Sequence, residues 1–173
     1  MSFLKAEWKN LVLVNYEIDP IILEPYLPYG TQIDLHEGKC FISLVAFLFK
    51  DTSVLGVKWP GYINFEEANI RFYVTREDGE TIKRGVVFIK EIVPKHLITF
   101  VANTLYSENY ETMKMEHHFD QNSIEYRFGR EAVTNILSIE LDTTTEKIEE
   151  GSHAEFITEH YWGYAKINDR KTN

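Results

Sequence analysis

The segment Phe65–Val74, FEEANIRFYV, decides the fold because it is the clearest β-strand in the chain. It is rich in aromatic and β-branched residues and runs into a turn at Asp78-Gly79, as β-strands often do. Successive side chains of a strand point to opposite faces. One face therefore carries the polar row Glu67, Asn69, Arg71 and Tyr73. This row either faces water or forms the wall of a polar pocket.

The next strand favours the pocket. Arg84–Val93 is apolar on both faces apart from Lys90 and Glu91, and a strand covered on both sides rarely carries charge unless that charge is paired or lines a cavity. An antiparallel sheet can also turn one polar face to water without forming any site. Because the neighbouring strand Arg84–Val93 is covered on both faces, we expect the polar row beside it to be enclosed as well. Lys90 lies near the strand end, where a surface salt bridge is expected.

The other segments predict a mainly β (α+β) protein, built as an antiparallel β-barrel or a curved sheet. One main helix is expected at about 94–106, where apolar residues repeat at helical spacing after Pro94, and a short helix near 20–25 follows Asp19-Pro20. Residues 31–35 and 39–49 should form a hairpin around His36-Glu37-Gly38, and 51–62 a loop. Further strands are expected at 11–18, 112–119, 123–128, 135–141 and 153–166.

Bulk properties limit the classes of protein and partner. A chain of 173 residues with 44% hydrophobic residues predicts a single domain, 1–173, with a substantial core. The net charge of −9 argues against nucleic acid or an anionic membrane as a partner. No signal peptide or apolar run of about 18 residues is present, so we expect a cytoplasmic protein. The single Cys40 lies in an apolar run and predicts a buried thiol.

A carboxylate, a lysine and an imidazole surround the turn before the main helix. Glu91 precedes Pro94, and Lys95 and His96 follow directly. At a helix N-terminus in an apolar cavity, desolvation and the helix dipole would lower the pKa of a lysine, and a neutral amine can form a Schiff base with a carbonyl. The alternative is an ordinary solvated lysine in the first turn, which this spacing alone favours.

Other patterns of chemistry are weaker. The histidines form no zinc-binding pattern, and no glycine-rich nucleotide loop or nucleophile elbow is present, so we expect neither a metal nor a cofactor. The segment Glu159–Tyr164 is unusually aromatic, and Trp162 within it either packs in the core or walls a ligand cavity.

Taken in order, the segments resemble the acetoacetate-decarboxylase-like β-barrel superfamily and, within it, the uncharacterised YqjF-like family. The resemblance is carried by 12–19, 27–30, 41–49, 65–74, 84–93 and 159–164. It implies a curved or closed β-sheet around a small-molecule cavity. Relatives of this kind continue past Tyr164 into at least one more strand, so we expect a shortened chain, and an edge left open would favour a homodimer.

The resemblance also implies roles for particular residues. Lys95 stands where the decarboxylases carry their Schiff-base lysine, but His96 replaces the cationic neighbour that lowers the pKa of that lysine. Lys9 is the counterpart of an arginine that precedes the first strand, and no carboxylate matches the family's pocket glutamate near Pro60. Decarboxylase chemistry is therefore only half supported.

Three hypotheses follow. In the first, the cavity binds a small anionic or carbonyl-containing molecule: Arg71 supplies the charge, Glu67 and Asn69 orient the ligand, and Tyr73 and Trp162 wall it. In the second, the protein is a lyase that forms an imine at Lys95 with a β-keto acid. The third is a non-catalytic interaction protein with a filled interior.

Overall fold

The structure is a computed structural model that describes residues 4–54, 56–105, 109–131, 133–168 and 171–172. Its strands are β1 Leu4–Glu17, β2 Thr31–Ile33, β3 Phe41–Val54, β4 Phe65–Asp78, β5 Thr81–Val93, β6 Tyr110–Thr112, β7 Lys114–Phe119, β8 Ser123–Arg130, β9 Val133–Glu140, β10 Trp162–Tyr164, β11 Lys166–Asn168 and β12 Lys171–Thr172. The helices are α1 His96–Leu105 and α2 His153–Thr158, with two short 3₁₀ helices, η1 Pro20–Ile22 and η2 Glu24–Tyr26.

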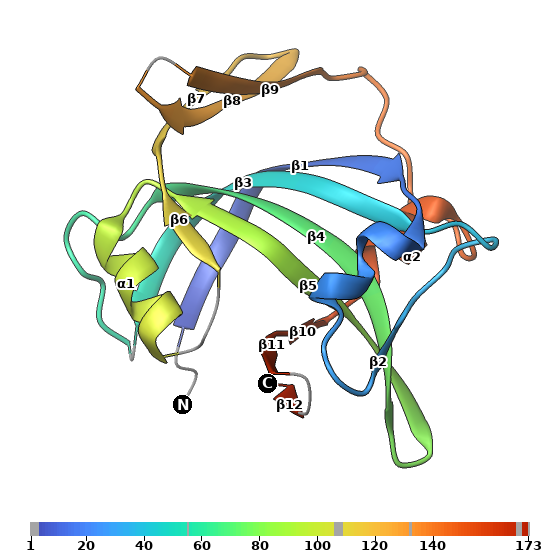
Figure 1. The fold of residues 1–173 in the computed structure, drawn as a ribbon. Helices are drawn as coiled ribbons and strands as arrows, with labels where there is room; N and C mark the ends of the chain where they lie inside the picture. The colour runs from blue at the N-terminus through green and yellow to red at the C-terminus, as the bar shows by residue number, and fades with distance from the viewer. Residues whose placement is uncertain (1–3, 55, 106–108, 132, 169–170, 173) are drawn as a thin grey trace.

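A curved main sheet forms the centre of the fold, and across the described residues it is not closed into a barrel (Figure 1). Its strand order is β1-β3-β4-β5-β10, with β2 on β4 and β6 on β5. The long strands pair antiparallel, while β6 and β10 pair with β5 in parallel. The expected mainly β fold with a curved sheet is confirmed. β4, the strand of the polar row, pairs with β3 over residues 65–72 and with β5 over residues 68–78.

A second sheet, β7-β8-β9, lies over one side of the main sheet (Figure 1). Small side chains of the main sheet, among them Ala46 and Ala68, pack against large ones from the second sheet. The second-sheet residues in this cluster are Met115, Ile124, Tyr126, Phe128 and Leu137. We call this side of β4, which carries Ala68 and Phe72, the apolar face.

The opposite side of β4 carries the polar row, and we call it the polar face. Helices cover its two ends. Ile98 of α1 packs on a cluster that includes Phe47 and Val93, and Phe156 and Ile157 of α2 pack against Tyr73. The polar row therefore lies between two apolar clusters.

Two strand predictions were wrong. β2 pairs with β4 instead of forming a hairpin with β3, although a tight turn with one bridge between His36 and Lys39 forms as expected. Residues 153–158, expected as strand, form α2. Its signal was the capping box Ser152-x-x-Glu155: the Glu155 N–H donates to Ser152 Oγ at 3.1 Å, while Glu155 Oε2 accepts from the Gly151 N–H at 2.7 Å.

Smaller differences concern the ends of elements. The main helix begins at His96 and not at Pro94, the segment near 20–25 forms two 3₁₀ turns, and β3 continues to Val54 into the predicted loop. Cys40 is buried, as expected. Within the described ranges, no helix has the length and apolar character needed to cross a membrane.

Candidate functional site

Three of the four residues of the polar row on β4 are buried, and Arg71 is half-buried. Glu67, Asn69 and Tyr73 are only 4%, 2% and 1% exposed, so this face is not a water-facing surface. The register adds one more carboxylate, because Glu91 of β5 lies directly opposite Asn69 and is 4% exposed. Burying a polar group costs free energy unless the group is hydrogen-bonded. The hydrogen-bond partners of each buried group therefore show which atoms remain for a ligand.

One half of the row is built around Glu67. The Asn69 side-chain amide donates to Glu67 Oε1 at 3.2 Å, and the Tyr110 hydroxyl donates to Glu67 Oε2 at 3.3 Å. Tyr110 belongs to β6, which pairs with β5 next to Glu91. Three strands thus bring two carboxylates, an amide and a phenol together on one buried surface.

The other half is a chain of hydroxyl groups. Ser43 Oγ lies 2.5 Å from Asn15 Oδ1 and 2.5 Å from the Tyr73 hydroxyl. An amide oxygen only accepts, so Ser43 donates its single proton to Asn15, and Tyr73 donates to Ser43. Tyr73 is therefore fixed in the sheet, and its ring faces the Arg71 guanidinium at 5.8 Å from the ring centroid.

Two buried polar atoms in the middle of the row lack hydrogen-bond partners among the described residues. They are Nε of Arg71 and Oδ1 of Asn69. No carboxylate in the described part of the chain lies within ion-pairing distance of the Arg71 guanidinium. Buried polar atoms are nearly always paired, so a partly unmatched cation and an unmatched carbonyl oxygen suit an added ligand.

Lys95 lies directly before α1, and His96 is the first residue of this helix. The Lys95 ammonium is 5.7 Å from the centroid of the Tyr62 ring, and the side chain of His96 is exposed. No hydrogen bond or ion pair between described residues links Lys95 to Arg71 or Asn69. Glu91 of β5, in contrast, is buried directly opposite Asn69 of the row.

Lys9 and Trp162 each contact a charged residue outside the row. Lys9 is exposed and pairs with Glu7 at 3.2 Å, beside a register shift in β1. Trp162 is 50% exposed and holds the Lys83 ammonium 4.4 Å from its ring centroid. Lys90 forms the expected ion pair, with Glu111 at 2.6 Å.

A second buried polar cluster, which the sequence did not indicate, adjoins Tyr73. The side chain of His160 is fully buried and its ring centroid lies 4.8 Å from that of Tyr73. Its Nδ1 is 2.7 Å from the Phe156 carbonyl oxygen and its Nε2 is 3.0 Å from Asp34 Oδ2. Both hydrogen bonds form together only when both ring nitrogens carry protons. Arg84 Nε also donates to Asp34 Oδ2, at 2.8 Å.

Burial pushes the pKa of the Asp34 carboxyl upward, but the hydrogen bonds from His160 and Arg84 outweigh burial and hold that pKa below its ordinary value of 3.8. Asp34 therefore stays ionised between the donor groups of His160 and Arg84. This cluster fixes one end of the polar row. Among the described residues, no three His, Cys, Asp or Glu side chains are placed to hold a metal ion.

Residues 5–173 match the family DUF2071, described as an uncharacterized conserved protein, and the chain belongs to this family. Among individual relatives, the chain is 23% identical over 124 residues to the uncharacterized protein YqjF of Bacillus subtilis (strain 168). That alignment covers 71% of this chain and 50% of YqjF, so the chain spans about half the length of the curated relative that it matches.

Several solved enzyme structures have a similar fold. An acetoacetate decarboxylase-like enzyme from Sphingomonas wittichii RW1 aligns with a TM-score of 0.64 at 14% identity, covering 90% of this chain and 61% of that one. Acetoacetate decarboxylase from Legionella pneumophila aligns with a TM-score of 0.62 at 11% identity, and the alignment covers 78% of this chain and 48% of that one. The enduracididine biosynthesis enzyme MppR, complexed with pyruvate, aligns with a TM-score of 0.58 at 12% identity, and the alignment covers 79% of this chain and 56% of that one. The expected fold is thereby confirmed.

Proposed function

We propose that the polar face binds a small organic anion of the keto-acid class and that Arg71 is its anchoring cation. The observation that carries this proposal is the pair of unmatched buried atoms, Arg71 Nε and Asn69 Oδ1. A guanidinium presents donors in a planar fork that suits a carboxylate. The fold likeness to an enzyme complexed with pyruvate supports the choice of ligand class.

Each part of the row has a role in this proposal. Arg71 pairs with the ligand carboxylate, and Asn69 Oδ1 accepts a hydrogen bond from a hydroxyl, enol or hydrated carbonyl of the ligand. Glu67 holds the Asn69 amide through the 3.2 Å hydrogen bond, which fixes the direction of its oxygen. Tyr73, locked to Ser43, forms a rigid wall beside the guanidinium.

Calorimetric titration of the protein with pyruvate and with acetoacetate tests this function. Replacing Arg71→Met keeps the length of the side chain and removes its charge, and we expect at least a tenfold loss of affinity, since hydrogen bonds to charged groups contribute about 1.5–3 kcal/mol. Arg127→Met is the matched control, because Arg127 lies on β8 and pairs with Glu125 near the surface. Equal affinity of the Arg71→Met variant and the native protein would refute the proposal.

A second candidate is a lyase that acts on a β-keto acid through Lys95. It is favoured by the position of Lys95, half-buried at the start of α1 without an ion pair among the described residues, in a chain with the fold of acetoacetate decarboxylase. The amine would condense with the ketone and release water, and the protonated imine would take the electron pair left when carbon dioxide departs. Protonation of that carbon and hydrolysis would regenerate the amine.

Borohydride reduction in the presence of acetoacetate separates the two functions. A lyase gives a reduced adduct on the Lys95 peptide, seen by mass spectrometry, and the Lys95→Met variant gives none. Binding of acetoacetate in the calorimeter without any adduct would leave the binding function and exclude the lyase.

A further inference from the structure

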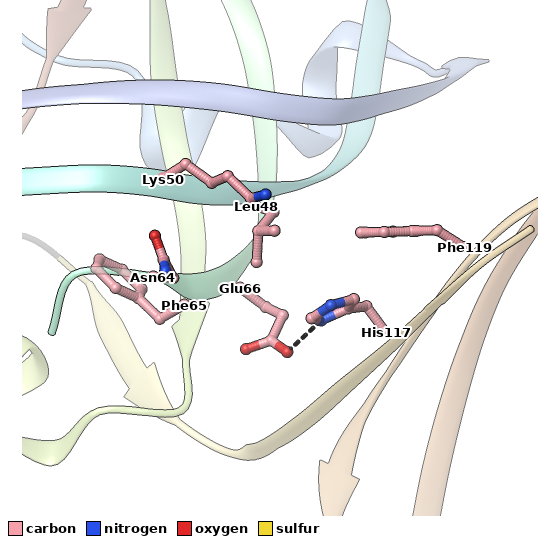
Figure 2. A pocket seen from close by; sticks show the side chains of 7 residues that line it. All are labelled: Leu48, Lys50, Asn64, Phe65, Glu66, His117 and Phe119. Atoms are coloured by element: carbon pink, nitrogen blue, oxygen red, sulfur yellow. Dashed lines mark hydrogen bonds and ion pairs between the residues drawn. The ribbon is translucent and has the colours of Figure 1, made fainter. Parts of the chain in front are cut away.

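A cavity of about 310 Å³ lies on the opposite side of β4 from the polar row, between the end of the main sheet and β7 (Figure 2). Ligand sites typically have volumes of about 300–1,000 Å³, so this cavity suits a small molecule. The residues that line it are Leu48, Lys50, Asn64, Phe65, Glu66, His117 and Phe119.

A hydrogen bond between a carboxylate and an imidazole defines the side of the cavity nearest β7. Glu66 Oε1 and His117 Nδ1 are 2.6 Å apart, with the side chains 14% and 36% exposed. A carboxylate oxygen accepts, so Nδ1 of the imidazole carries the proton and its ring is fixed in direction. The Glu66 oxygen nearest β7 is thus occupied by the His117 N–H.

Lys50 supplies an exposed positive charge at the rim of the cavity, and the ion pair of its neighbour Asp51 is with Lys58 at 2.7 Å. No carboxylate among the described residues lies within ion-pairing distance of the Lys50 ammonium, and Figure 2 shows its side chain extended above Leu48. Asn64 adds a donor, because its Oδ1 already accepts from the Asp51 N–H at 3.1 Å and its amide nitrogen remains for a ligand.

Apolar groups form the remaining wall. Leu48 lies directly opposite Glu66 in the sheet, and the Phe119 ring stacks on His117 with centroids 4.5 Å apart and planes 26° apart. Figure 2 shows Phe119 and His117 on the β7 side and Leu48 and Glu66 on the main-sheet side. Between them is an apolar slot with a cation at its rim.

We propose that this cavity binds a small organic carboxylate with an apolar body. The apolar body inserts between Leu48 and Phe119, and the carboxylate pairs with the Lys50 ammonium and accepts from the Asn64 amide. The site is independent of the polar row, because Glu66 and Glu67 point to opposite faces of β4. The chain thus carries two small-molecule sites, one on each side of its central strand.

Titration of the ¹⁵N-labelled protein with three compounds of similar shape tests the proposal by NMR. They are phenylacetate, the neutral phenylacetamide and the cationic phenethylamine. We expect phenylacetate to bind best and to shift the amide signals of Leu48, Glu66 and Phe119. Lys50→Met should weaken its binding about two- to fivefold, the range for partly exposed ion pairs. Lys50→Glu should reverse the order, so that phenethylamine binds better than phenylacetate.

Lys147→Met and Lys147→Glu are the matched controls, because Lys147 is an exposed lysine in the segment between β9 and α2. They change the net charge equally and should leave the order of the three compounds unchanged. The proposal is overturned if phenylacetate and phenylacetamide bind equally, if none of the three compounds binds, or if the shifts appear around Asn69 and Arg71 instead. The same shifts retained in the Arg71→Met variant would confirm that the two sites are separate.

Discussion

At the scale of single residues, the Asp34 carboxylate makes stability depend on pH. Its pKa lies below the ordinary value despite burial, because His160 and Arg84 donate to it. A carboxyl group whose pKa is depressed on folding stabilises the protein above its unfolded pKa, and this contribution disappears as the pH falls through the folded value. The stabilising effect of Asp34 is therefore present near neutral pH and is lost in the acid range.

Replacing Asp34→Asn tests this dependence. At neutral pH we expect the free energy of unfolding to fall by about 1.5–3 kcal/mol, because His160 and Arg84 lose an anionic partner. Between about pH 5 and pH 2 the gap between variant and native protein should narrow, as measured by urea unfolding. Asp120→Asn, in an exposed turn, is the control. A gap that stays constant over this range would show that the Asp34 charge contributes nothing.

Residue patterns predicted part of the polar site and missed the rest. Alternation along β4 was enough to place Glu67, Asn69, Arg71 and Tyr73 on one face, because strand geometry fixes side-chain direction. The Asp34–His160 contact joins residues 126 apart in the chain, and no local pattern reports such a pairing. Whether Lys95 and Trp162 take part in ligand binding stays a prediction.

At the scale of elements, Gly85 controls the attachment of β10 to β5. A Cβ at this position would lie 2.5 Å from the Trp162 carbonyl oxygen and 2.6 Å from the Tyr164 ring. Neither contact is tolerable, and the backbone oxygen cannot move without breaking the pairing that joins Trp162 to Gly85. A glycine is thus required for the close approach of two strands, although its backbone does not adopt a positive φ.

Replacing Gly85→Ala should therefore destabilise the protein by about 1–3 kcal/mol, the range for overpacking. The amide protons of β10 should exchange faster with solvent, which hydrogen exchange measures. Gly163→Ala is the matched control on β10 itself, since a Cβ there would meet its nearest neighbour, the Phe88 ring, at 3.8 Å, an ordinary contact. Equal exchange rates in the two variants would contradict this account of the junction.

The positions of the strands were easier to predict from the sequence than the pairing between strands. Residue composition located β4, β5, β7 and β8 closely, because alternation and turn residues are local signals. β2 pairs with β4 and not with its neighbour in sequence, since pairing depends on which strand has a free edge at that point. α2 was missed because six residues show too little periodicity, although its capping box was visible.

At the scale of the whole molecule, the packing between the two sheets decides whether the chain behaves as one domain. The second sheet docks through Leu137 and the large residues around it onto the small side chains of β3 and β4. Among the described residues, no other apolar cluster joins β7-β8-β9 to the main sheet. We therefore expect both sheets to unfold together, as the single domain predicted from chain length requires.

Replacing Leu137→Ala tests this cooperativity. Leu137 is 8% exposed, and truncating a buried leucine costs about 2–5 kcal/mol, so the midpoint of thermal unfolding should fall markedly while the transition remains single. Ile136→Ala is the control, because Ile136 is the next residue on β9 and is 58% exposed; it should change the midpoint little. Calorimetry and the near-ultraviolet signal should report the same midpoint in each variant. If Leu137→Ala instead splits the transition in two, then β7-β8-β9 is an independent unit, and the cavity between it and the main sheet lies at a movable boundary.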